Sequence, residues 1–219
     1  MRTGEVFALT WDDIDLEKRI IKISKTVYSK PKDSKGRWFL GTTKAEGSSR
    51  EVYISDTLYT ALKNYYKQQQ YLKKKYKSNY KKYALEPIKN KYGKITEYQI
   101  VESKYKKKNN IEMIFTRKDG TYVGTDITKY PFKIIHHELG ITNCRFFDLR
   151  GSYATKSLRN GAEIKDIANV LGHSRIETTE NYYIGTTADS IKQNIIEFEK
   201  IIISEKINTI IKFENYNSI

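Results

Sequence analysis

Hydrophobic and polar residues alternate along residues 19–27, and residues 38–44 and 50–54 are two further short stretches that we interpret as strands. The first stretch is rich in isoleucine, and a turn containing proline, aspartate and glycine separates it from the second. Alternation with a period of two is typical of strands that bury one face. We therefore predict a small three-stranded antiparallel sheet near the N-terminus. We interpret residues 1–11 as the end of a helix and residues 112–116 as a further short strand.

Apolar residues at helical spacing follow the predicted sheet over residues 57–75 and dominate the second half of the chain. Spacings of three and four residues are typical of amphipathic helices, which we expect at residues 57–75, 125–139, 149–160, 163–171 and 174–184, with a tail helix over about 190–219. Ser55 and Asp56 are suitable N-caps for the first of these helices, and Asp148 is suitable for the third. The predicted fold class is therefore α+β and mainly α-helical, in a single domain over residues 1–219.

One predicted helix junction carries a histidine and a tyrosine. A helix ends at Gly172, and Ser174 and Glu177 have the spacing of a capping box that starts the next helix. His173 lies at the junction, and Tyr183 follows about two and a half turns along the new helix. The two side chains either line a chemical site or form a polar corner between packed helices.

A basic insertion over about residues 65–110 is rich in lysine and tyrosine and poor in acidic residues. One interpretation is a solvated helix face followed by a long loop. The other is a surface that follows a phosphate backbone, with tyrosines that stack on bases or pack internally. The composition of this stretch fits both interpretations.

The formal net charge of the 219 residues is +14 at pH 7. Such an excess indicates a polyanionic partner, with nucleic acid the first candidate and a membrane surface the second. The single cysteine, Cys144, excludes an internal disulfide and a cysteine-rich metal site. Because no apolar run reaches the length of a membrane span and the N-terminus lacks a signal-peptide pattern, we expect a soluble, cytoplasmic protein that does not bind membranes.

The residues that carry candidate chemistry are mostly cationic and suit phosphate. The candidates are Arg2, Lys44, Arg150, His173 and Tyr183. Two arginines can clamp phosphate oxygens and offset the charge that grows in a transition state. A histidine can donate a further hydrogen bond, a lysine can protonate a leaving oxygen, and a tyrosine becomes a nucleophile where cations favour its phenolate.

The sequence argues against two other kinds of phosphate chemistry. It has no cluster of carboxylates at metal-ligand spacing, which two-metal nucleases require. It also has no glycine-rich loop with a lysine, which nucleotide hydrolysis requires. We therefore expect no metal and no cofactor.

Four motifs, in order along the chain, resemble those of the catalytic domain of the tyrosine recombinases, the phage and transposon integrase family. They cover essentially the whole chain apart from the basic insertion. The first motif is Arg2-Thr3-Gly4-Glu5, followed by Ala8-Leu9-Thr10-Trp11-Asp12-Asp13-Ile14-Asp15, and the second is Lys44 within Thr-Lys-x-x-x-Ser-x-Arg, which ends at Arg50. The third motif is Asp148-Leu149-Arg150 with Tyr153-Ala154-Thr155. The fourth is Leu171-Gly172-His173-Ser174 with Thr178-Thr179 and Tyr183.

The resemblance implies a role for each candidate. Tyr183 would attack the scissile phosphate of double-stranded DNA, form a 3′-phosphotyrosyl link and release a 5′-hydroxyl. Arg2 and Arg150 would hold the phosphate, His173 would donate a hydrogen bond to it, and Lys44 would be the general acid. The remaining acidic residue of the first motif, Glu5, would orient Arg2 or its helix.

The chain departs from the family pattern in two places. Phe147 stands where the family usually has a histidine, and phenylalanine can neither donate a hydrogen bond nor accept a proton. The first-arginine motif lies at the very start of the sequence, so the core-binding domain that normally precedes it is expected to be absent. This indicates a fragment of a larger integrase or a truncated reading frame.

Two other functions fit part of the sequence. Residues 163–185 form a helix, a short turn and a helix, which could be a helix-turn-helix DNA reader without catalysis. The chain could also be a decayed integrase that still binds DNA. An active member of the family is expected to assemble as a tetramer on DNA, whereas an isolated catalytic domain could be monomeric and its tail helix could contact a neighbouring protomer.

Overall fold

The computed structural model describes residues 1–30, 38–42, 49–103, 109–142, 144–173 and 179. Met1–Arg175 form one compact unit, and Ile176–Ile219 form a second. Lys44, Tyr183 and the helices predicted at 174–184 and 190–219 lie outside the described residues.

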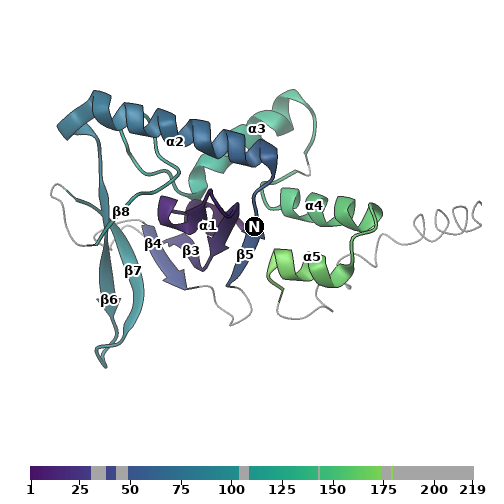
Figure 1. Cartoon of the computed structure of the whole chain (residues 1–219), viewed down its shortest axis with the longest axis horizontal. Helices are drawn as coiled ribbons and strands as arrows, with labels where there is room; N and C mark the ends of the chain where they lie inside the picture. Colours follow the sequence, from purple (N-terminus) through teal and green to yellow (C-terminus); the bar gives the residue numbers. More distant parts are fainter. Residues whose placement is uncertain (31–37, 43–48, 104–108, 143, 174–178, 180–219) are drawn as a thin grey trace, which may run out of the picture. The chain divides into compact units, whose positions relative to one another are not determined.

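The first unit contains two antiparallel sheets among its described residues. The smaller sheet has the strand order β1-β2-β5, formed by Ile14–Asp15, Ile20–Ile23 and Arg50–Tyr53. The larger sheet has the order β3-β4-β7-β6-β8 (Figure 1), formed by Lys25–Ser29, Trp38–Thr42, Ile95–Glu102, Tyr83–Lys89 and Asn110–Ile111. The fold is therefore mixed α/β, and the prediction of one small sheet was only partly right.

The strand predicted at residues 19–27 is two strands in different sheets. Ile21, Ile23 and Val27 are buried, whereas Lys25, which lies between the last two in the period of two, is partly exposed. The pairing changes in the middle, because β2 pairs with β5 whereas β3 pairs with β4. Lys25, at the start of β3, forms an ion pair with Asp13 at 2.8 Å. A period of two reports which residues are buried, but not which strand lies alongside.

The part of the basic insertion that one interpretation described as a long loop contains a β-hairpin of β6 and β7 (Figure 1). Ala84 and Ile100 on this hairpin enter the core of the larger sheet. The carboxamide of Asn90 closes the turn by accepting hydrogen bonds from the backbone of Tyr92 and Lys94. The strand predicted at 112–116 was wrong, since the pairing with β6 is made by Asn110–Ile111 instead.

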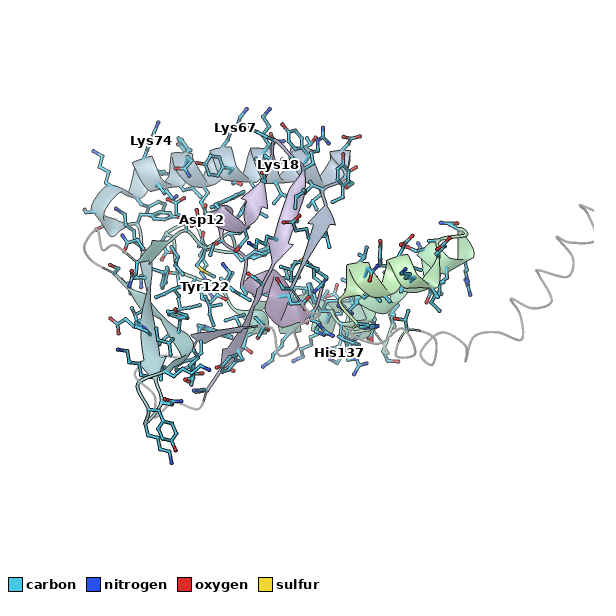
Figure 2. All side chains as sticks on the ribbon, turned by 60° about the horizontal axis from the view of Figure 1, so that its bottom comes forward. Asp12, Lys18, Lys67, Lys74, Tyr122 and His137 are labelled. Atoms are coloured by element: carbon cyan, nitrogen blue, oxygen red, sulfur yellow. The ribbon has the colours of Figure 1, made fainter. Side chains whose placement is uncertain are left out.

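The helix predicted at 57–75 is confirmed as α2, Asp56–Tyr76, with Ser55 as its N-cap. Its second half is anchored by a buried amide rather than by an apolar stripe. Gln69 accepts a hydrogen bond from the Trp11 indole at 2.6 Å and donates to the carbonyls of Met113 and Ile114. The opposite face carries exposed lysines, of which Lys67 and Lys74 are labelled in Figure 2.

Helix α1, Thr3–Phe7, leads into the 3-10 turn η1, Trp11–Asp13, and the intervening residues join the two cores. Phe7 and Ala8 pack in the core of the larger sheet, together with Tyr122, which is labelled in Figure 2. Leu9 packs in the core of the smaller sheet. The first residues of the chain are therefore held on both sides.

The helices predicted in the second half are confirmed as far as the structure describes them. A 3-10 turn, η3, Lys77–Asn79, follows α2. Another, η4, Thr125–Thr128, precedes α3, Lys129–Glu138. Helices α4, Asp148–Arg159, and α5, Ile164–Leu171, contact one another, and α5 also contacts β5 (Figure 1). Among the described residues, none of the helices has the length and hydrophobicity to cross a bilayer.

Candidate active site

The end of helix α5 is the centre of the candidate site. Ile167, Ala168 and Leu171 bury one face of the helix, and Gly172 ends it in the left-handed conformation with φ +68°. The backbone N–H of His173 folds back to the Ala168 carbonyl at 3.0 Å. The last carbonyls of a helix have no partners within the helix and need donors from elsewhere.

Three arginines from three distant parts of the chain donate to three consecutive carbonyls at this helix end. Arg50 Nε donates to the carbonyl of Val170 at 2.7 Å. Arg150 Nη2 donates to that of Leu171 at 2.6 Å, and Arg2 Nη2 to that of Gly172 at 3.5 Å. These cations also lie at the negative end of the helix dipole, where positive charge is stabilised.

Glu5 binds two of the three arginines. Its carboxylate accepts the backbone N–H of Arg2 at 2.7 Å and Arg2 Nη1 at 3.0 Å. The same carboxylate accepts Arg50 Nη2 at 2.8 Å. Glu5 was predicted to orient Arg2 or its helix, and its carboxylate pairs with the Arg2 side chain and accepts the backbone N–H of Arg2, the N-cap residue of α1.

The ionisation of Glu5 reflects this double pairing. Its side chain is only 2% exposed, and burial by itself raises the pKa of a carboxyl. Hydrogen bonds from Arg50 and from the backbone and side chain of Arg2 outweigh burial and lower the pKa of Glu5 to about 2. Glu5 is therefore a carboxylate at any pH near neutrality.

Arg2 and Arg150 differ in how they are held. The side chain of Arg2 is 43% exposed, so its guanidinium reaches solvent. Arg150 is 7% exposed and shares the buried face of α4 with Ala154, one turn further along. Arg2 is thus accessible from solvent, whereas Arg150 is buried beneath the surface of the site.

His173 follows the glycine turn and lies in the field of these cations. Burial lowers the pKa of His173 from its ordinary value, and the positive charges of Arg150, Arg2 and Arg50 lower it further. The imidazole is therefore neutral at pH 7 and has one N–H to donate.

The structure brings together three of the five residues predicted for the site. Arg2, Arg150 and His173 meet at the end of α5, whereas Lys44 and Tyr183 lie outside the described residues. Arg50 was not predicted as a site residue, although it ends the motif that contains Lys44. The one signal for it was that motif, since nothing in the local sequence indicates a buried arginine.

Phe147 lies immediately before α4 and its side chain is turned outward, with 45% of the residue exposed. Its neighbour Phe146 is the aromatic residue that packs inward, against Phe7 and Phe132. Asp148, which we predicted to cap α4, is its first helical residue and accepts hydrogen bonds from the backbone and guanidinium of Arg145. That capping prediction was wrong by one position.

The sequence profile of the phage integrase family matches residues 1–188, so the chain belongs to this family. Since the match includes all five predicted site residues, the resemblance of the motifs is confirmed at the level of the family.

Known relatives agree with this membership. A tyrosine recombinase described as XerC-like, from Caldanaerobacter subterraneus subsp. tengcongensis, is 27% identical over 188 residues, which are 84% of this chain and 42% of the relative. The integrase of transposon Tn1549, solved with transposon right end DNA, has a TM-score of 0.62 at 16% identity over 91% of this chain and 55% of its own. The XerA recombinase has a TM-score of 0.52 at 19% identity, over 90% of this chain and 53% of its own. The chain thus spans about half the length of these relatives.

The packing of Gly172 yields a stability prediction with an internal control. A Cβ at Gly172 would lie 2.6 Å from Arg50 Nη1, whereas a Cβ at Gly161 would meet nothing within 4 Å. Both glycines have positive φ, at +68° and +82°. We expect Gly161→Ala to lower the free energy of unfolding by about 1 kcal/mol through backbone strain. Gly172→Ala should cost about 1–3 kcal/mol more, because Arg50 must move. Urea denaturation measures both, and equal losses would contradict the contact.

The pKa of Glu5 predicts an acid-dependent loss of stability. As the pH falls, the unfolded chain binds a proton at Glu5 before the folded chain does. The stabilisation is therefore complete above about pH 4.5 and is lost as the pH falls towards about 2. Its size is on the order of 3 kcal/mol. Glu5→Gln should remove this part of the dependence of the free energy of unfolding on pH, which is measured by urea denaturation from pH 7 to pH 2.5. Glu17→Gln, at an exposed position, is the matched control, and coincident curves for the two variants would refute the assignment.

Proposed function

We propose that the chain is the catalytic part of a tyrosine-type site-specific recombinase. It cleaves and rejoins DNA through a 3′-phosphotyrosyl intermediate, in the integration or excision of a phage or other mobile element. The observation that carries the proposal is the convergence of Arg2, Arg150 and His173 on the end of α5, in a chain that belongs to the phage integrase family.

The charges at the end of α5 suit a phosphodiester. Three guanidinium groups and one carboxylate, that of Glu5, leave positive charge in excess. Among its contacts with the described residues, the side chain of Arg2 uses two of its five N–H donors. The others are available to nonbridging phosphate oxygens, in the bidentate geometry that guanidinium groups favour. Donors fixed before the reaction stabilise the pentacoordinate transition state without reorganising.

Tyr183 and Lys44 complete the proposed reaction. The phenolate oxygen of Tyr183 attacks phosphorus, and the bond from phosphorus to the 5′-oxygen of the next nucleotide breaks. Lys44 gives its proton to that oxygen, which leaves as a 5′-hydroxyl. Because one phosphodiester replaces another, the step needs no external source of energy, and the 5′-hydroxyl of a second strand can reverse it.

His173 suits the role of a hydrogen-bond donor better than that of an acid. Its pKa is lowered by burial and by the neighbouring arginines, so it is neutral at pH 7. A neutral imidazole can donate one N–H to a phosphate oxygen without adding a further charge to the cluster.

Double-stranded DNA is the proposed partner. Exposed lysines lie along α2 and at the tip of the β6–β7 hairpin, and such surfaces bind the phosphate backbone without reading sequence. The Tn1549 integrase structures that share this fold contain transposon right end DNA in one case and a circular intermediate DNA in another. We propose a tetramer on two duplexes for the full-length protein.

The nucleophile can be identified by covalent capture on DNA. We expect the chain to form adducts with a pool of nicked random-sequence duplexes, because a nick close to the cleavage point lets the short fragment that carries the new 5′-hydroxyl dissociate, which prevents religation. Tyr183→Phe should reduce the adduct at least about 1000-fold, since it removes the attacking oxygen. Tyr182→Phe is the matched control and should retain it. Denaturing gels quantify the adduct, and mass spectrometry of the DNA-linked peptide locates it.

Each contrary result has a distinct meaning. An adduct that maps to Tyr182 would overturn the choice of nucleophile. Binding of DNA without any adduct would favour the decayed integrase or the helix-turn-helix reader.

Phe147 gives a second test of the same site. Phenylalanine cannot accept the proton of the tyrosine hydroxyl, and a histidine at this position could. Phe147→His is therefore expected to raise the rate of adduct formation by about 10-fold or more. Leu149→His places an imidazole on the same turn of α4 and is the control. An equal change in both variants would show that the gain is not specific to position 147.

A further inference from the structure

Arg50 occupies a place in the site that the proposed reaction leaves without a role. It begins β5, and its side chain is only 7% exposed. One edge of its guanidinium donates to the carbonyl of Val170, in the last turn of α5. The other donates to both carboxylate oxygens of Glu5, at 2.8 and 3.3 Å. Arg50 therefore joins the smaller sheet, the start of α1 and the end of α5.

Glu5 and Val170, the partners of Arg50 described above, lead to the two kinds of group that would bind phosphate. Glu5 also binds Arg2, through both the backbone and the side chain. Val170 lies three residues before His173, on the helix end whose next carbonyl accepts Arg150. A shift of Arg50 would thus be transmitted to Arg2 through Glu5, and to His173 and Arg150 through α5.

Lysine could not make this set of contacts. The planar fork of arginine presents donors in two directions at fixed angles, whereas an ammonium is a single point of charge on a flexible stem. A lysine at this position would keep the charge and could still pair with Glu5. It could not at the same time hold the Val170 carbonyl, which is bound through Nε rather than through the terminal nitrogens that bind Glu5.

We propose that Arg50 is a positioning residue of the phosphate site, which holds Arg2 in register with His173 and Arg150 without itself contacting DNA. This inference rests on the proposed recombinase function. It assigns Arg50 an effect on the rate of phosphodiester cleavage that is separate from any effect on DNA binding, because misplacement of the phosphate-binding groups by about 1 Å costs up to about 100-fold in rate.

The test compares Arg50→Lys with Arg19→Lys. Arg19 is the matched control because it also forms an ion pair beside the smaller sheet, with Asp56, but lies at the other end of the β2–β5 pair from Arg50. Adduct formation is measured at saturating DNA, on a nicked duplex captured from the random pool. The Kd for that duplex is measured by fluorescence anisotropy, and Tm by calorimetry.

Arg50→Lys is expected to slow adduct formation about 10- to 100-fold, with a Kd within about twofold of that of the unaltered chain. Arg19→Lys should match the unaltered chain in both. The double variant Arg2→Lys/Arg50→Lys should lose less than the product of the single losses, because the two residues act through the same carboxylate. A loss of DNA affinity equal to the loss of rate, or fully multiplicative losses, would overturn the proposal.

Hydrogen exchange provides a readout that does not depend on catalysis. The amides of Gly172 and His173 are bonded to carbonyls of α5, and Arg50→Lys should speed their exchange about 10-fold or more while Arg19→Lys leaves it unchanged. If the unaltered chain forms no adduct, the recombinase function is refuted and this exchange still tests whether Arg50 holds the helix end. Exchange and rate both unchanged in Arg50→Lys would refute the positioning role alone.

Discussion

Three consecutive carbonyls at the end of helix α5 impose the constraint on which the candidate site depends. Val170, Leu171 and Gly172 each accept an arginine, and these arginines come from β5, from α4 and from the residue that precedes α1. Like charges brought this close would repel one another in a nonpolar interior. The carbonyl dipoles and the carboxylate of Glu5 offset that repulsion. The helix end thus gathers segments that are far apart in the sequence and holds their guanidinium groups on one side of the fold.

The same contacts decide the chemical state of the residue that follows. Gly172 turns the chain in a left-handed conformation, with Arg50 packed where a Cβ would lie, and His173 comes directly after it. The arginines that bind the helix end also lower the pKa of His173, in addition to the effect of its burial. Shape and charge are therefore coupled at this turn, because the arginines that bind the helix end also set the pKa of the imidazole that follows it.

The local pattern of residues in the sequence was sufficient to predict much of the fold. The helices α2, α4 and α5 and the turn at Gly172 follow from apolar spacing, caps and glycines. Alternation could not show that residues 19–27 divide between two sheets, because burial of Ile23 and Val27 is the same whichever strands pair with them. The β6–β7 hairpin could not be recognised in the sequence, because its lysines and tyrosines suggested a solvated loop.

In the site, motif order predicted that Arg2, Arg150 and His173 belong together, and Glu5 was predicted beside Arg2. The burial of Arg50 depends on the approach of α5 to β5, a tertiary contact that leaves no trace in the residues around it.

Positive charge is distributed in this chain in two physically different ways. The lysines of α2 and of the hairpin are exposed, so water and salt screen them and each acts nearly independently of its neighbours. Arg50 and Arg150 are buried and bonded, so their positions are defined and their charges act in a medium of lower polarity. The net charge reflects mainly the exposed lysines, which can attract a polyanion of any sequence. Chemistry at one chosen phosphate requires the second, because only donors with fixed positions can distinguish a transition state from the ground state. The overall charge of +14 is therefore weak guidance to the site, and the hydrogen bonds at a single helix end are strong guidance.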